Sequence, residues 1–234
     1  MTNETVSKSK TIFIFVSTII LGFVLFALPN IFLGVFKING GLSGINLALM
    51  GFFQFFSVCT LIHFALKQLH MDFKDIGLKS AHWKTDTLIG LGVTILRAII
   101  DFGFITPNTG GASRPDIQEV ITSLDGTTLG LISLIILGVV GGGITEEIYN
   151  RGFFITVMKG LFKNEKIGLW ISVIVSILFF SAGHLPSSDI LWYDILVASS
   201  IYTALFLLTG RLTASIISHA SWNMLAILII HYTY

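Results

Sequence analysis

The stretch TIFIFVSTIILGFVLFALPNIFLGVF, from Thr11 to Phe36, contains no charged residue. A helix needs about 20 consecutive apolar residues to cross the hydrocarbon core of a bilayer, and this stretch exceeds that length. It is also longer than the roughly 7–15 apolar residues of a cleavable signal peptide, and no small-residue cleavage site follows it. The stretch therefore predicts a membrane-spanning helix.

Six further apolar stretches follow along the chain. They are Ile45–Leu66, Thr87–Ile105, Leu129–Glu146, Ile167–Ser181, Ile190–Leu208 and Leu212–Ile230. Open strands are excluded, because lipid leaves the polar groups at their edges unpaired. The sequence predicts an all-α, polytopic transmembrane helical bundle with about seven spans, within a range of six to eight.

The composition supports a membrane protein. The chain of 234 residues is 53% hydrophobic and 12% charged, whereas a soluble domain has about 25% charged residues. Lys plus Arg number 14 and Asp plus Glu number 13, so the basic surface that a nucleic-acid-binding protein needs is not expected. The single cysteine excludes a disulfide framework and a cysteine-rich metal site.

The basic residues predict the orientation. Ten of the 14 fall on one side of the predicted bundle: Lys8, Lys10, Lys67, Lys74, Lys79, Lys84, Lys159, Lys163, Lys166 and Arg211. The loops on the other side hold Lys37 and Arg114. Because basic loops remain cytoplasmic, we expect the N-terminus to be inside and Tyr234 to be outside.

The fourth span carries charges that lipid does not tolerate. A charged group at mid-bilayer costs about 2.5–3.5 kcal/mol on insertion scales, so such groups are paired, hydrated or functional. Glu147 and Arg151 are four residues apart, which predicts an ion pair on one helix face. Glu146 points about 100° away and needs another partner. The same charges are also compatible with the cytoplasmic end of a helix.

Two more polar clusters follow. Phe180-x-x-x-His184 ends the fifth span, and His219-x-x-x-Asn223 lies within the seventh, where both polar residues face the same way. A histidine near a helix end is more often interfacial than a ligand, and a His–Asn pair can simply join two helices. In the third span, Arg97-x-x-x-Asp101 predicts an ion pair that fixes helix packing, with substrate binding as the alternative.

The heights of these clusters can be compared. If the fourth and fifth spans form a hairpin that turns near Asn164, Glu146 and His184 both lie about 27–30 Å from the turn. The end of the fourth helix must then protrude or run obliquely. His219 lies only about 12 Å beyond Arg211 and fits this height less well.

Together these groups suit hydrolysis. A glutamate in a water-holding cavity can act as a general base, and histidine and asparagine can stabilise an oxyanion, without a covalent intermediate. Alternatively, Glu146, His184 and His219 can bind zinc and leave one position open for water. The two interpretations differ in whether a metal is required.

Glu146-Glu147-x-x-x-Arg151, Phe180-x-x-x-His184 and His219-x-x-x-Asn223, in this order on successive spans, resemble the CAAX protease and bacteriocin-processing (Abi) family of intramembrane proteases. The resemblance covers roughly Thr128 to Ile230. It implies one membrane domain, with N-terminal helices and loops in residues 1–127 and a catalytic core in residues 128–234. Asn150 departs from the family, which usually has apolar residues between the glutamates and the arginine.

The resemblance also implies residue roles. The catalytic residues are expected to be Glu146, His184, His219 and Asn223, and the supporting residues Glu147, Arg151 and Phe180. Glu146 is expected to activate water with the help of His184, and His219 and Asn223 to bind the oxyanion. We expect no cofactor, with zinc held by Glu146, His184 and His219 as the alternative.

The expected function is an endopeptidase in the membrane, open toward the cytosol, whose partners are the lipid bilayer and a hydrophobic or membrane-associated peptide. The short chain is similar to bacterial members that act in bacteriocin immunity or peptide maturation, which implies a bacterial plasma membrane. One alternative is a non-catalytic membrane protein for immunity or peptide binding. A small transporter is the other, although we find no internal repeat of the transporter kind.

Overall fold

The computed structural model describes residues 6–234, except for the side chain of Asn39. Residues 1–5, on which the predicted location of the N-terminus falls, lie outside the described residues. Seven helical segments are long and apolar enough to cross a membrane. They are Lys8–Phe36, Ile45–Gln68, Trp83–Asn108, Thr128–Lys159, Glu165–Gly183, Asp189–Thr209 and Leu212–Thr233. Residues 6–234 contain no strand, so the all-α class and the seven spans are confirmed.

Five of the spans are single helices and two are composite. The single helices are α1 (Lys8–Phe36), α2 (Ile45–Gln68), α8 (Glu165–Gly183), α9 (Asp189–Thr209) and α10 (Leu212–Thr233). The third span joins α3 (Trp83–Ile100), the π-helical η2 (Asp101–Ile105) and α4 (Thr106–Asn108). The fourth joins α6 (Thr128–Ile136), the π-helical η4 (Leu137–Ile155) and α7 (Thr156–Lys159). Short connections include η1 (Ile38–Gly40), η3 (Gly111–Ser113) and α5 (Pro115–Ser123).

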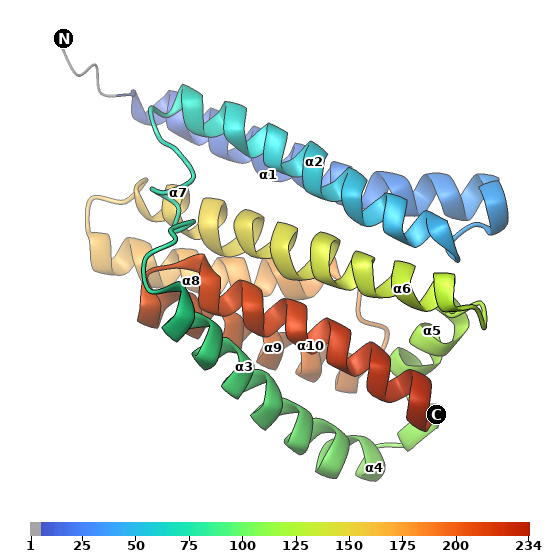
Figure 1. Cartoon of the computed structure of the whole chain (residues 1–234). Coiled ribbons are helices and arrows are strands. Elements are labelled where there is room, and N and C mark those ends of the chain that lie inside the picture. The colour runs from blue at the N-terminus through green and yellow to red at the C-terminus, as the bar shows by residue number, and fades with distance from the viewer. Residues whose placement is uncertain (1–5) are drawn as a thin grey trace.

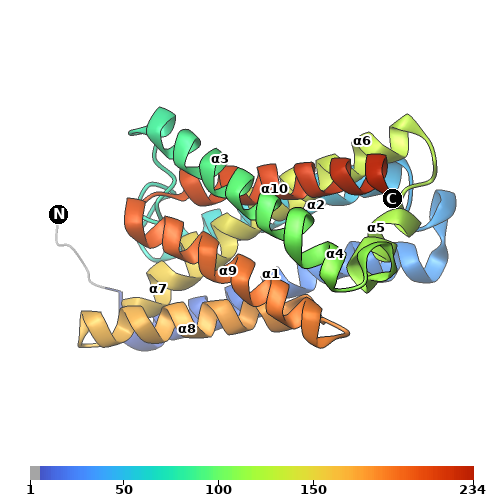
Figure 2. The same ribbon diagram turned by 90° about the horizontal axis from the view of Figure 1, so that it is seen from below.

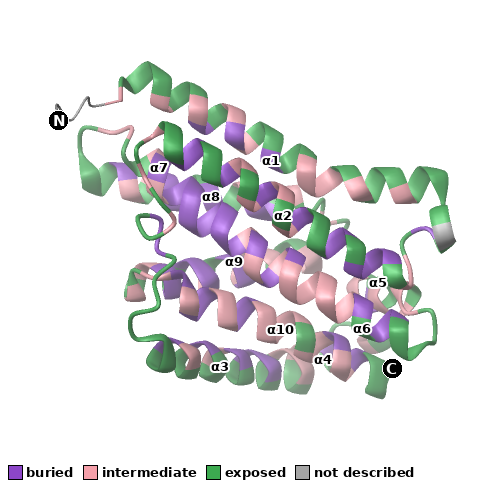
Figure 3. Cartoon of the chain, turned by 45° about the horizontal axis from the view of Figure 1, so that its top comes forward, coloured by how far each residue is buried: buried purple, intermediate pink, exposed green. Residues whose placement is uncertain are grey.

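The segment η4 lies at the centre of the bundle. It packs between α2 and α10, and α10 also packs against α3 (Figure 1). From below, α8 and α9 cover another side of the same segment (Figure 2). Buried residues are therefore concentrated in η4, whereas α1 is largely exposed (Figure 3). The outward faces of the spans carry large apolar side chains, including Phe13, Leu88, Leu96 and Leu208, as expected of helices that contact lipid.

Two glycines explain how other helices approach η4. A methyl group at Gly143 would collide with the Cα of Ala220 on α10, and one at Gly141 would lie 2.5 Å from Oε1 of Gln54 on α2. Small residues at helix crossings allow such close packing in membranes. The segment η4 is a π-helix, and within it the Thr145 hydroxyl donates to the carbonyl of Val140, five residues earlier.

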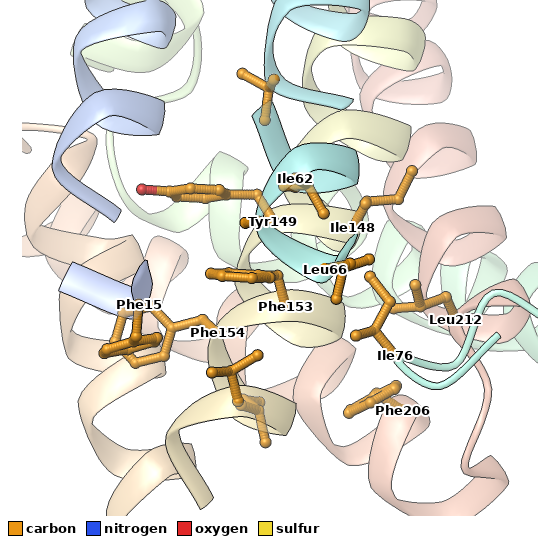
Figure 4. Packing of buried hydrophobic residues seen from close by; sticks show 14 of the residues in the cluster. Phe15, Ile62, Leu66, Ile76, Ile148, Tyr149, Phe153, Phe154, Phe206 and Leu212 are labelled. Atoms are coloured by element: carbon orange, nitrogen blue, oxygen red, sulfur yellow. The ribbon is translucent and has the colours of Figure 1, made fainter. Parts of the chain in front are cut away.

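The apolar core lies beside the motif-bearing part of η4. Phe153, Phe154 and Tyr149 pack against Phe15 of α1 and Ile62 of α2 (Figure 4). The Tyr149 hydroxyl donates a hydrogen bond to the carbonyl of Ile19. These contacts attach α1 to η4 and so fix the position of the helix that faces Glu146.

The loop between α2 and α3 is attached to the start of α10. Ile76 is fully buried in the core (Figure 4), and the amide of Leu212 donates to the carbonyl of Gly77 at 2.9 Å. Arg211 binds Asp86 through two hydrogen bonds of 2.7 Å. These bonds raise the pKa of the Arg211 guanidinium, because the carboxylate favours its charged form.

The predicted hairpin between the fourth and fifth spans is confirmed. Its turn is capped by Asn164, whose side chain accepts from the amide of Ile167. The connection between α7 and α8 extends past the start of α10 in both Figure 1 and Figure 2. This protrusion removes the mismatch in height: His184 lies far along α8 from the turn, yet at the level of His219 near the start of α10.

Candidate active site

Glu146 and two histidines meet at the junction of η4, α8 and α10. The carboxylate oxygen Oε2 of Glu146 lies 3.9 Å from Nε2 of His184 and 4.0 Å from Nε2 of His219. This oxygen is buried and has no hydrogen-bond partner among residues 6–234. The structure therefore brings together three of the four predicted catalytic side chains around one unsatisfied oxygen, a site suited to a bridging water.

In each histidine, the hydrogen bond made by Nδ1 determines whether Nε2 donates or accepts. His184 Nδ1 lies 2.8 Å from the carbonyl of Phe180, and His219 Nδ1 lies 2.9 Å from Oε1 of Glu147. Carbonyl and carboxylate oxygens only accept hydrogen bonds, so both Nδ1 atoms must donate. When the rings are neutral, both Nε2 atoms are therefore proton acceptors that face Glu146.

The Glu147–Arg151 ion pair predicted from their spacing is present. Arg151 Nη1 lies 3.0 Å from Oε1 of Glu147, and both side chains are 0% exposed. Arg151 also donates to the hydroxyl and the carbonyl of Ser199 on α9 at 2.9 and 3.2 Å. Glu147 thus joins two elements of the site, because the same oxygen accepts from His219. It supports the site by orienting that histidine as well as by pairing with the arginine.

Asn223 lies next to this group, on the side of Gly142. Its amide Nδ2 donates to the carbonyl of Gly138 at 2.8 Å, which holds the side chain in place. A methyl group built on Gly142 would lie 2.7 Å from this nitrogen and 3.9 Å from Nε2 of His219. The two nitrogens therefore border one small space that Gly142 leaves open. An amide N–H, and an imidazole that carries a proton on Nε2, can stabilise an oxyanion at such a place.

Aromatic rings enclose the histidines. Phe180 lies with its ring centroid 4.4 Å from that of His184 and 6.1 Å from that of His219, and the Arg151 guanidinium is 4.3 Å above its face. The predicted supporting role of Phe180 is consistent with this packing. Tyr202 of α9 stacks on His219 at 4.3 Å. Nothing in the sequence pattern marked Tyr202 or Ser199, since neither belongs to a recognisable motif.

A cavity of about 560 Å³ leads to Glu146 and His184. Its lining includes the apolar side chains of Phe23, Phe26, Ile31, Phe179 and Leu185, with Gln54, Asn30 and Asn150 as polar members. No Lys or Arg lines it among the described residues. Much of the wall comes from α1, which sequence reasoning did not connect with the site because α1 carries no polar motif.

Asn150, which departs from the family pattern, bonds to the backbone of Glu146 rather than to its carboxylate. Its side-chain amide donates to the backbone carbonyl of Glu146 at 3.1 Å, and the backbone carbonyl of Asn150 accepts from the Ser176 hydroxyl. The side-chain oxygen of Asn150 is buried without a partner among residues 6–234. Asn150 therefore adds polarity to the cavity wall near Glu146.

The geometry does not fit zinc held by Glu146, His184 and His219. Zinc binds nitrogen and oxygen at about 2.0–2.1 Å, so tetrahedral ligand atoms lie about 3.3 Å apart. The carboxylate oxygen lies 3.9 and 4.0 Å from the two imidazole nitrogens. The described residues contain no group of three His, Cys, Asp or Glu placed to hold a metal ion.

The fold and this site define a polytopic membrane protein with a buried glutamate–histidine centre. Residues 128–225 match the family described as "Rce1-like: Type II CAAX prenyl endopeptidase Rce1-like". This matched region contains all three motifs from which the resemblance to the CAAX/Abi family was predicted, and it covers less than half of the chain. No curated protein and no solved structure matches the chain significantly.

We expect Gly142→Ala to reduce peptide cleavage strongly while the protein still folds. The added methyl group would fill the space between Asn223 Nδ2 and His219 Nε2. Loss of one oxyanion donor typically lowers kcat by about 10²–10³-fold, and we expect a reduction of that size. The measurements are kcat in detergent and the thermal unfolding temperature.

Gly143→Ala is the matched control for this prediction. A methyl group there meets the backbone of Ala220, so α10 must move and the yield of folded protein should fall. If Gly142→Ala were as active as the wild type, the space beside Asn223 would not be where the oxyanion forms.

Proposed function

We propose that the protein hydrolyses peptide bonds by means of a water held between Glu146, His184 and His219, without a metal. The observation that carries the proposal is the buried, unpartnered oxygen of Glu146, which lies 3.9 and 4.0 Å from two imidazole nitrogens. A water with hydrogen bonds of about 2.8 Å can reach all three groups: it donates to Glu146 and to Nε2 of His184, and it accepts from Nε2–H of a protonated His219. A bound water with three polar partners is the ordinary state of such a site.

The groups around that water can perform each proton transfer. Glu146, assisted by His184, takes a proton as the water oxygen attacks the carbonyl carbon. A new C–O bond forms, and the carbonyl electron pair moves to oxygen beside Asn223 and His219. The oxyanion then re-forms the carbonyl as the C–N bond breaks, and the proton is delivered to the leaving nitrogen. His219 carries a proton on Nε2 throughout these steps and donates it in a hydrogen bond to the oxyanion, and the charged ring is stabilised by Glu147, which accepts from Nδ1.

The cavity supports a hydrophobic or membrane-associated peptide as the substrate. Its wall is mainly aromatic and aliphatic, with Phe23, Phe26 and Phe179 among the lining residues, and it lacks a basic side chain in the described part of the chain. An apolar wall favours a side chain or hydrocarbon chain that leaves water on binding. Glu146 and His184 lie at the polar part of this wall, where a peptide bond would be placed.

The proposed setting is the plasma membrane of a bacterium, with the N-terminus and the Lys-rich ends of the helices in the cytoplasm. It is supported by the ten basic residues on one side of the bundle. The proposed biological role is bacteriocin immunity or maturation of a peptide. The alternative function, a non-catalytic immunity protein, predicts that host protection survives Glu146→Gln.

We expect the purified protein to cleave hydrophobic peptides in detergent at the same rate with and without a chelator. The reason is that Glu146 and the two histidines are spaced for a water rather than for zinc. Product formation is followed by mass spectrometry over a panel of apolar peptides, and a zinc-dependent protease serves as the positive control for chelation. Activity that is lost with the chelator and restored by zinc would overturn the metal-free mechanism.

A further inference from the structure

Tyr202 is a fully buried residue in contact with His219 whose role the mechanism leaves open. Its ring lies parallel to the imidazole of His219, with centroids 4.3 Å apart and an interplanar angle of 15°. Its side chain belongs to α9, whereas His219 belongs to α10. Tyr202 therefore covers one face of the imidazole from a neighbouring helix.

The phenol of Tyr202 is itself held. Arg97 Nη1 donates to the hydroxyl at 3.0 Å, Nε donates to Asp101 at 3.0 Å, and Nη2 donates to Asp194 at 2.8 Å. The guanidinium also lies 3.7 Å over the ring of Trp222. All three guanidinium nitrogens thus have partners, and the arginine cannot turn without breaking several contacts.

The predicted Arg97–Asp101 ion pair is confirmed by these contacts. The sequence did not predict Asp194 or Tyr202 as further partners, because both lie about a hundred residues away on α9. The Arg97–Asp101 pair does more than join two turns of the third span. It connects α3 to α9 and, through the Tyr202 ring, to His219.

A hydrogen bond alone does not fix the plane of His219. The bond from Nδ1 to Glu147 defines one direction, but the ring can still pivot about it. Such a pivot would turn Nε2 away from Glu146 and from the space beside Gly142. A planar ring that packs flat on one face of the imidazole, as Tyr202 does, removes this freedom. The Phe180 ring lies at 70° to the imidazole and does not cover its face in this way.

We propose that Tyr202 is a positioning residue for His219, and that Arg97, with Asp101 and Asp194, holds Tyr202 in register. The proposal rests on the proposed function of Glu146, His184 and His219. Neither Tyr202 nor Arg97 lines the cavity described above, so the role is to orient the histidine rather than to touch the substrate. Catalytic geometry depends on such supporting residues, because a displacement of about 1 Å can cost about 10²-fold in rate.

The test compares two substitutions at Tyr202 with one control on the same helix. Tyr202→Phe keeps the stacked ring and removes only the hydroxyl, whereas Tyr202→Met keeps apolar bulk without a planar face. Tyr193→Leu, at an exposed position of α9, is the control. We expect kcat to fall about 10²-fold in Tyr202→Met with KM within twofold, to fall less than about fivefold in Tyr202→Phe, and to be unchanged in Tyr193→Leu.

Several results would overturn the proposal. One is a folded Tyr202→Met protein with normal kcat, and another is a rise in KM at constant kcat, which would make Tyr202 a substrate-binding residue. Equal losses in the Phe and Met variants would show that the stacked ring is not what matters. If Tyr202→Met does not fold, Asp194→Ala decides. The Asp194 side chain is partly exposed, and kcat should fall severalfold because Nη2 of Arg97 loses its acceptor; unchanged kcat refutes the proposal.

Failure of this inference differs from failure of the proposed function. If the wild type cleaves peptides and Glu146→Gln does not, the function stands, and the Tyr202 variants then test positioning alone. If the wild type and Glu146→Gln cleave equally, the proposed function itself is wrong.

Discussion

Glu146→Gln should abolish peptide cleavage and leave the fold intact. The amide is nearly the same size as the carboxylate, but it cannot accept a proton from water. A general base contributes about 10²–10⁴-fold to the rate, so single-turnover cleavage should fall by at least that range. The fold should persist, because Oε2 of Glu146 makes no hydrogen bond to any residue in 6–234. Cleavage is measured by mass spectrometry and folding by thermal unfolding in detergent.

Glu165→Gln is the control for this experiment. Glu165 is exposed in the first turn of α8, far along the helix from His184. Its substitution should change neither cleavage nor unfolding temperature. Full activity in Glu146→Gln would remove the glutamate from the chemistry and would leave the histidine cluster without a base.

Arg151→Met should destabilise the protein far more than Glu146→Gln does. Arg151 and Glu147 are both completely buried and lie 3.0 Å apart. Removal of one partner leaves a buried charge without compensation, which costs about 3–5 kcal/mol. We therefore expect a loss of unfolding free energy of that size, measured by denaturation in mixed micelles, and a low yield of folded protein.

The double variant Glu147→Gln with Arg151→Met separates charge from packing. When both charged groups are gone, no lone charge remains, and neutral replacement of a buried pair is often well tolerated. We expect the double variant to regain much of the stability lost in Arg151→Met. Its activity should stay low, because His219 has lost the carboxylate that accepts from Nδ1. Wild-type stability in Arg151→Met would show that the pair contributes little to the fold.

Much of the fold could be predicted from the sequence because membrane spans are encoded locally. Runs such as Thr11–Phe36 have no other stable state in lipid than a helix, and all seven expected spans are found. The Glu147–Arg151 and Arg97–Asp101 pairs could also be predicted, since both depend only on residues four apart. The division at residues 127 and 128 stays a prediction, and so do the catalytic roles of Glu146, His184, His219 and Asn223.

The remainder of the site depends on contacts between helices that are far apart in the sequence. Ser199 and Tyr202 lie on α9, where no local pattern distinguishes them from lipid-facing neighbours, yet they contact Arg151 and His219. The cavity wall from α1 is similar, because Phe23 and Phe26 are ordinary residues of an apolar helix. The wide π-helical turn of η4 was also not expected, since the 100° spacing assumed for adjacent residues is that of an α-helix.

The measurement that tests the site most simply is an experimental density map of the wild-type protein at a resolution that shows ordered water. We predict one water molecule in contact with Oε2 of Glu146 and with Nε2 of both His184 and His219, and Asn223 beside the space left by Gly142. A map in which these side chains lie apart, or in which Glu146 is turned away from both imidazoles, would contradict the proposed mechanism.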